Sequence, residues 1–342
     1  MLVRTRLLTK LAPVLALAQP ASAADFCVAT GSGLQSALTV AQNNGEGDHI
    51  RLRAGTYTRI APGTAFTYAS SEDFNLSLTG GWNAGCTDTS FDPPTILDGG
   101  DARRVMEIAS LGAGTAAAIG VFQLQFSNGL AATDGGGLRI VGAAGNSMEV
   151  TLVHNTFVGN VAGTSGGGLS ASGNGRLQVV NNLFVANEAQ VSFGAAALNS
   201  NGDSAFVSHN TIIGNVAPST GGVRFGGSSL LHLANNILWA NGDIDLLVLA
   251  GSSHFRYHNN IGAVTAPAPG ILVGEITTAP EFEPGLFNFV PRPRGALFNA
   301  GIAAPPGGMV GSDLAGRPRV SAGLPDIGAY EAEVLFYDGF QP

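Results

Sequence analysis

The stretch His154-Asn-Thr-Phe-Val-Gly-Asn160 decides the fold, because the chain repeats it at nearly regular intervals. The related segments are Asn181-Asn-Leu-Phe-Val-Ala-Asn187, His209-Asn-Thr-Ile-Ile-Gly-Asn215, Asn235-Asn-Ile-Leu-Trp-Ala-Asn241 and the partial His258-Asn-Asn-Ile261. Their first residues lie 27, 28, 26 and 23 positions apart. A unit of this length cannot bury its own apolar face, so successive units must stack into a solenoid.

A second element recurs between these segments and completes each unit. It reads Gly136-Gly-Leu138, Gly167-Gly-Leu169, Ala196-Ala-Leu198 and Gly221-Gly-Val223. Each unit holds three short apolar strands, which in the clearest case are 168–172, 176–181 and 183–185. The pattern predicts an all-β, right-handed parallel β-helix with three sheets and strands ~4.8 Å apart. A leucine-rich repeat needs a fixed leucine spacing and a propeller blade needs a period of about 40 residues or more, so neither fits.

One asparagine column runs through every unit. Its members are Asn155, Asn182, Asn210, Asn236 and Asn259. Asparagine suits the turn between two sheets because it tolerates left-handed backbone, and stacked amides can bond to each other along the column. The alternative is ligand binding, but a binding site seldom repeats in every unit. We therefore predict a structural ladder.

Short segments at both ends of the repeat complete the predicted organisation of the chain. The shared helical face of Leu34, Ala37, Leu38 and Ala41 predicts a short helix that caps the N-terminal end of the core. We assign residues 24–264 to the β-helix with this cap, 265–331 to an irregular, proline-containing C-terminal cap, and 332–342 to a tail.

Residues 1–23 are predicted to be a secretory signal peptide. They combine a basic start, a short apolar run and the small-residue site Ala21-Ser-Ala23. The apolar run is too short to span a bilayer, and no later stretch reaches that length, so we expect no transmembrane span. In an oxidising compartment Cys27 and Cys86 are expected to form a disulfide, and the alternative is two free buried thiols.

The composition limits the partners of the chain. Of its 342 residues 45% are apolar, which suffices for a long core, and only 12% are charged. Without the predicted signal peptide 13 basic residues remain against 24 acidic ones, so the net charge becomes −11 and no lysine is left. Such a chain is a poor binder of nucleic acid, and we expect a monomer without a cofactor.

Several motifs resemble those of known families. Gly47-Asp48 and Gly55-Thr-Tyr57 after the cap helix resemble the entry to pectin-lyase-like β-helix proteins, and the Gly-Gly-Leu and Phe-x-x-Asn pieces resemble chlamydial polymorphic outer-membrane protein repeats. Three later segments resemble the choice-of-anchor Q region of bacterial surface or exported proteins: Asn299-Ala-Gly301, Asp313-Leu-Ala-Gly-Arg317 and Asp326-Ile-Gly-Ala-Tyr-Glu331. Residues 336–341 resemble a short tail of exported xanthomonad-type proteins. The ensemble implies this fold and export from a bacterium, but no particular activity.

The resemblance implies that polysaccharide-cleaving members use the exposed face of the first sheet, which here holds the Gly-Gly-Leu strands. The outward residues that follow the inward Leu or Val form our candidate surface: Arg139, Ser170, Asn199 and Arg224. We expect no carboxylate on this face, since the nearest acids lie at strand edges: Asp134, Glu188 and Asp203. Arg224 is either a base or anion contact or, as we favour, a solvated arginine.

Catalysis is therefore not favoured. A glycoside hydrolase needs two carboxylates about 5–10 Å apart, and a calcium-assisted lyase needs clustered acids together with a base. Asp243 and Asp245 are the best local acid pair, but they follow a different strand. His154, His209 and His258 share one column two coils apart, about 10 Å, which is too far for a common metal, so we predict no metal site.

Two hypotheses of different classes remain. We favour a non-catalytic, secreted or cell-surface protein for adhesion, glycan contact or envelope architecture, whose partner is a polysaccharide or a cell-envelope surface. The alternative is a polysaccharide lyase or glycoside hydrolase that acts on an acidic polysaccharide. The candidate face discriminates between them, because catalysis requires acids there.

Overall fold

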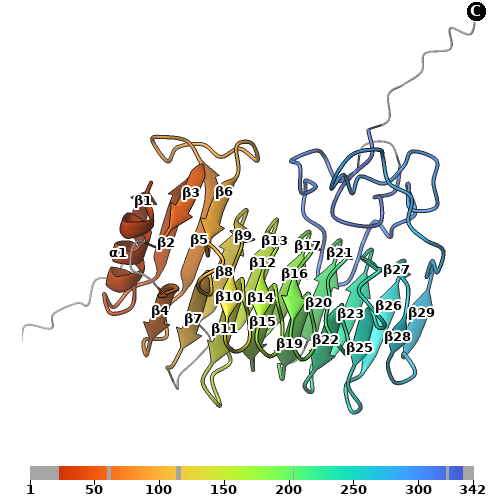
Figure 1. The fold of residues 1–342 in the computed structure, drawn as a ribbon, viewed down its shortest axis with the longest axis horizontal. Coiled ribbons are helices and arrows are strands. Elements are labelled where there is room, and N and C mark those ends of the chain that lie inside the picture. Colours follow the sequence, from red (N-terminus) through yellow and green to blue (C-terminus); the bar gives the residue numbers. More distant parts are fainter. Residues whose placement is uncertain (1–22, 60–62, 113–116, 203, 321–322, 334–342) are drawn as a thin grey trace, which may run out of the picture.

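The computed structural model describes residues 23–59, 63–112, 117–202, 204–320 and 323–333. It is a parallel β-helix with three main sheets, as the repeat predicts (Figure 1). One helix, α1 (Gly31–Ala41), lies at its N-terminal end. The predicted signal peptide, apart from its last residue, and residues 334–342 of the predicted tail lie outside the described residues.

Sheet A has ten strands, and each new coil adds one parallel strand. Its strands in spatial order are β1 (Ala24–Val28), β2 (Asp48–Arg53), β5 (Leu76–Trp82), β8 (Ala118–Phe122), β12 (Glu149–Val153), β16 (Leu177–Val180), β20 (Ser204–Ser208), β23 (Leu230–Ala234), β26 (His254–Tyr257) and β29 (Ile271–Val273).

Sheets B and C each have eight strands, and a small fourth sheet precedes sheet C. Sheet B contains β3 (Gly55–Thr58), β6 (Thr95–Asp98), β9 (Gln125–Ser127), β13 (Thr156–Val158), β17 (Leu183–Val185), β21 (Thr211–Ile213), β24 (Ile237–Trp239) and β27 (Asn260–Ile261). Sheet C contains β4 (Phe66–Ser70), β7 (Met106–Ser110), β11 (Leu138–Gly142), β15 (Leu169–Gly173), β19 (Ala196–Ser200), β22 (Val223–Gly226), β25 (Leu246–Val248) and β28 (Val264–Thr265). The small sheet is β10 (Leu130–Ala131), β14 (Val161–Ala162) and β18 (Glu188–Ala189).

The ends of the solenoid agree with the sequence in most respects. The side chains of α1 that are buried against the core include all four of the predicted helical face, Leu34, Ala37, Leu38 and Ala41. Strand β1 before the helix was not predicted, and it is tied to the loop after β5 by the disulfide Cys27–Cys86. The strands continue past the predicted boundary at residue 264, because β28 and β29 add to sheets C and A.

Columns of like residues fill the interior. The rings of Phe126, Phe157 and Phe184 stack in sheet B with centroids 5.0 and 4.5 Å apart. The predicted asparagine column lies fully buried beside them at the turn between sheets A and B. Each amide donates to the Oδ1 atom of the next one, from Asn155 to Asn259, over 2.9 to 3.1 Å.

A second buried column closes the turn after sheet B. It runs Asn160, Asn187, Asn215, Asn241, with amide-to-amide distances of 2.8 to 2.9 Å. Asn241 then donates to the Oδ1 atom of Asp245 at 2.9 Å, so this carboxylate ends the ladder. Asp245 is 4% exposed and also accepts from the Ala263 backbone, and it therefore has a structural position rather than a catalytic one.

Residues 274–320 and 323–333, here called the C-terminal arm, double back along the side of the solenoid instead of covering its end (Figure 1). They lie over the turn between sheets A and B, where one residue of each coil has positive φ: His154, Asn181, His209, Asn235 and His258. His154 Nε2 bonds to Ser312 O at 3.0 Å, and His258 Nδ1 bonds to Ala300 O at 2.7 Å. The histidine column is therefore a docking surface for the arm.

A buried ionic cluster holds the distal part of the arm. Arg319, 1% exposed, donates to Glu331 at 2.7 Å and to the side chain of Asn181 on the solenoid. Asp326 accepts backbone N–H groups from both flanks of the cluster, and Asp313 accepts the N–H of Glu331 at 2.9 Å. Burial raises the pKa of Glu331 to about 7, although Arg319 opposes the shift.

We predict that replacing a ladder asparagine will destabilise the solenoid strongly. Asn182→Ala removes the acceptor of the Asn155 amide and the donor to Leu152 O, and both partners stay buried. The expected loss is about 3 kcal/mol, because each abandoned buried polar group costs about 1–3 kcal/mol. Urea unfolding measures it. Asn201→Ala on the exposed turn is the control, and an equal loss in both variants would contradict a special role of the ladder.

We predict that Glu331 makes the arm less stable as pH rises. Folded Glu331 keeps its proton up to about pH 7, whereas its ordinary pKa is 4.5, so the folded state binds more protons between these values. The neighbouring Asp326, whose pKa is also raised by burial, acts in the same direction, while His209, whose pKa is lowered well below 6.5, acts oppositely.

The test compares amide exchange of the arm at pH 5.5 and 8 in Glu331→Gln and the unmodified chain. Between pH 5.5 and pH 8 the free energy of opening the arm is expected to fall about 2 kcal/mol less in Glu331→Gln than in the unmodified chain. Glu281→Gln, at an exposed ion pair with Arg292, is the control and should keep the original profile. Identical profiles in the Glu331 variant and the unmodified chain would refute the assignment.

Candidate functional site

Three of the four candidate residues on sheet C lie in one row of outward positions, and Asn199 does not. Arg139 pairs in register with Ser170, and the next two positions of that row are Ala197 and Arg224. Asn199 belongs to the adjacent row, beside Ser172. The cause is that Gly194-Ala-Ala196, rather than Ala196-Ala-Leu198, matches the Gly-Gly-Leu element. A shift of two residues preserves the face, so Asn199 still points outward.

The expectation that this face has no carboxylate is wrong. Glu107 on β7 lies directly beside Arg139 in the outward row. The coil of Glu107 lacks the Gly-Gly-Leu element. The only local sign that Glu107 points outward is that its neighbours Met106 and Ile108 are buried. Glu107 therefore became visible only once the strands were placed in register.

Glu107 is held as a structural ion pair. Its two carboxylate oxygens contact Arg104 and Arg139, one each. Arg104 also donates to Gly135 O at 3.0 Å and to Asp134 O at 2.8 Å, so it anchors the carboxylate to the turn before β11 in the next coil. Burial lowers the pKa of Arg104, and Glu107 counteracts this shift. With both oxygens engaged by cations, Glu107 is a poor general acid or base.

Arg224 lies at the other end of the row, away from Glu107. Its guanidinium sits 5.8 Å from the ring centroid of Phe193, and burial lowers its pKa. Ser170 and Ala197 separate it from Arg139 in the row. Of the predicted flanking acids, Asp134 bonds to Thr164, Glu188 is exposed in β18, and Asp203 lies outside the described residues.

A hollow opens at the turns that connect the strands of sheet C to those of sheet A. It has a volume of about 570 Å³ and spans three coils. Its lining is Ser147, Glu149, Asn174, Gly175, Arg176, Gly202, Ser204 and Phe206. The sequence analysis did not select it, because its residues belong to turns of different coils and share no motif.

One polar group of this hollow, the Arg176 guanidinium, lies over an aromatic row. The Arg176 guanidinium lies 4.8 Å from the ring centroid of Phe206, and Phe206 stacks on His232 at 5.2 Å. His232 in turn contacts Phe255 at 5.3 Å, which continues the row along sheet A. The Arg176 guanidinium thus presents its N–H donors at the hollow, and Glu149 is the carboxylate of the lining.

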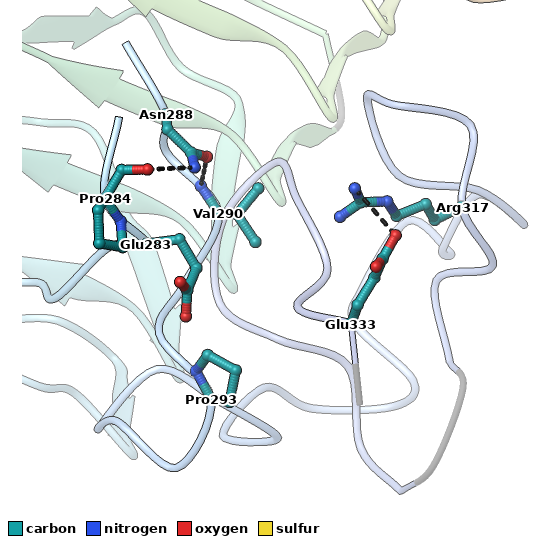
Figure 2. Close-up of a pocket in the computed structure, with 7 residues that line it drawn as sticks. All are labelled: Glu283, Pro284, Asn288, Val290, Pro293, Arg317 and Glu333. Carbon is teal, nitrogen blue, oxygen red and sulfur yellow. Dashed lines mark hydrogen bonds and ion pairs between the residues drawn. The ribbon is translucent and has the colours of Figure 1, made fainter. Parts of the chain in front are cut away.

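A further hollow, of about 350 Å³, lies within the C-terminal arm (Figure 2). Glu333 is paired with Arg317 at 3.1 Å, and Asn288 is bonded to Pro284 O at 3.3 Å. Glu283 lies apart from the Arg317–Glu333 pair in this view (Figure 2). Glu333 is 64% exposed, so this carboxylate is open to solvent.

The described residues show no other chemical centre. No group of three or more His, Cys, Asp or Glu side chains in them could hold a metal ion. Within the same residues, no helix is long and apolar enough to cross a membrane. Among the most strongly buried titratable groups are Arg319 and His209, which belong to the arm and its docking surface.

Comparison with known proteins does not identify a family for this chain. No family model matches the chain, and no curated protein matches it, so neither the polymorphic outer-membrane repeats nor the choice-of-anchor Q region is supported by a match. Among solved structures, the chain is similar to pectate lyase Pel9A, with 13% identity, a TM-score of 0.39 and coverage of 92% of this chain and 98% of that chain. The parallel coils and the three sheets themselves establish the fold as an all-β parallel β-helix.

Proposed function

We propose that the protein is an exported, non-catalytic β-helix that contacts polysaccharide at a cell surface. The observation that carries this proposal is the open hollow of about 570 Å³ between the turns and sheet A. It combines one guanidinium, one carboxylate, one amide, two hydroxyls and the side of an aromatic ring. Hydroxyl-rich sugars need such mixed donors and acceptors next to an apolar surface.

The arrangement of carboxylates supports binding over cleavage. Glu149 is the only carboxylate in the lining of the hollow, and Glu107 on sheet C is engaged by two arginines. Hydrolysis of a glycosidic bond uses a pair of carboxyl groups on opposite sides of the bond. Neither of these two places offers such a pair, so the same residues are better suited to hold a glycan than to break it.

Charge favours a neutral glycan. Without residues 1–23 the exported chain has 13 basic and 24 acidic residues, and its formal charge of −11 repels polyanions over long range. At the hollow, Arg176 and Glu149 contribute opposite charges, so the local field there does not select an anion. We therefore assign the hollow to a neutral polysaccharide, with Arg176 as the main donor to sugar hydroxyls.

A glycan array followed by titration calorimetry tests this proposal. Arg176→Ala is expected to weaken binding of the best neutral glycan about 10-fold or more, since a charge-assisted hydrogen bond is worth about 1.5–3 kcal/mol. Arg292→Ala, an exposed arginine of the arm, is the matched control and should bind as the unmodified chain does.

Two outcomes would overturn the proposal. One is equal binding by the Arg176 and Arg292 variants. The other is catalysis, read as a calcium-dependent rise in ultraviolet absorbance when the protein is incubated with uronate polymers, which would establish the lyase alternative instead.

A further inference from the structure

Arg224 is a half-buried cation whose surroundings on sheet C are apolar. In register it lies between Ala197 and Leu247, on the outward face of the sheet. Its guanidinium carbon is 5.8 Å from the centroid of the Phe193 ring. Within the part of the chain that the structure describes, the guanidinium has neither an ion pair nor a hydrogen bond. The positive charge is therefore not balanced by a neighbouring group.

Other buried arginines of the chain do have a counterion. Burial lowers the pKa of Arg104 and of Arg319, and each of them pairs with a glutamate, Glu107 and Glu331 respectively. Burial also lowers the pKa of Arg224, but no carboxylate opposes that shift. Because a cation that loses water without gaining an anion is costly, an anion from outside the chain would stabilise this guanidinium.

The ring beside Arg224 is held by a strained backbone. Phe193 has a φ of 64°, which is unfavourable for a bulky side chain. Gly135 and Gly166 occupy the same position in the two preceding coils, three residues before the paired strands of sheet C, and their φ values are 68° and 66°. Glycine adopts this backbone without steric cost, whereas Phe193 does not. Such strain is often found at functional sites, and here it places a ring against the cation.

Two neutral polar side chains continue from the guanidinium across the sheet. The guanidinium folds over Gly226, where a Cβ atom would lie 2.7 Å from Nη2 of Arg224. Gly226 pairs in register with Asn199, and Asn199 pairs with Ser172, so the three groups lie on adjacent strands about 4.8 Å apart. Among the described residues, neither the Asn199 amide nor the Ser172 hydroxyl has a hydrogen-bond partner.

We propose that Arg224, Asn199 and Ser172 bind one oxyanion, a carboxylate or a sulfate group, on the outward face of sheet C. The guanidinium supplies the positive charge and a fork of N–H donors that fits two oxygen atoms of such a group. The Asn199 amide and the Ser172 hydroxyl donate to further oxygen atoms of the ligand. One cation without a counterion sets the capacity at one negative charge.

This site is independent of the hollow to which we assign the neutral glycan. The guanidinium of the hollow, that of Arg176, lies over the Phe206 ring of sheet A, whereas that of Arg224 lies over sheet C. Each arginine can be replaced without the other. Failure of one proposal therefore leaves the other standing.

An NMR titration of the exported full-length chain tests the oxyanion site. Sodium acetate and sodium sulfate are added in separate arms at constant ionic strength, with sodium chloride as the reference, and the side-chain amide signals of Asn199 are followed. We expect a saturable shift, and the arm with the lower Kd identifies a carboxylate or a sulfate as the preferred group. Arg224→Gln is expected to raise this Kd about 10-fold or more, and Arg176→Gln to leave it unchanged.

A second variant tests the role of the strained ring. Phe193→Gly restores the residue of the two preceding coils, so it should fold as the unmodified chain does, which circular dichroism verifies. Loss of the ring should raise the Kd about 2- to 5-fold, because the guanidinium is no longer held in place.

Three results would overturn the oxyanion site. The first is the absence of saturation at about 100 mM of either salt. The second is an unchanged Kd in Arg224→Gln. The third is an equal loss of affinity in Arg176→Gln, since that result would place the anion at the hollow.

Discussion

The structure depends on a buried asparagine amide at the turn between sheets A and B in five successive coils, from Asn155 to Asn259. Each amide spans two neighbouring coils, since it donates to the Oδ1 atom of the next asparagine and to a backbone carbonyl of the previous coil. A slip of one residue in any coil would leave several of these buried polar groups without partners, at about 1–3 kcal/mol each. The ladder therefore keeps coils of 23 to 28 residues in a common register.

The same turn also determines which side chains of the solenoid contact the C-terminal arm. The residue before each ladder asparagine has positive φ, and its side chain faces outward to the C-terminal arm. Histidines and asparagines serve there because they tolerate this backbone and supply hydrogen-bonding atoms. The arm in turn brings Arg319, Glu331 and Asp326 into a buried cluster. Their displaced pKa values reflect docking of the arm rather than catalysis, which shows why a perturbed pKa alone does not locate an active site.

Two exposed surfaces of the described residues differ in character. The hollow near Arg176 is polar, open and prepared by ring stacking, which suits a flexible chain of sugars. The end at β29 is apolar, because Ile271, Leu272 and Val273 of this last described strand of sheet A are 38%, 50% and 50% exposed.

The sequence alone determined the period, the three strands of each coil, the ladder column and the buried face of α1, because each of these is a local pattern that recurs or has helical spacing. Only the tertiary structure placed Glu107 beside Arg139, 32 residues away, and moved Asn199 out of the row of Ser170. It also brought Arg319 to Asn181 across 138 residues. Coils of unequal length hide which outward residues become neighbours, and the course of an irregular arm depends on contacts distant in sequence. The solenoid could therefore be predicted from its repeat, whereas its surfaces could not.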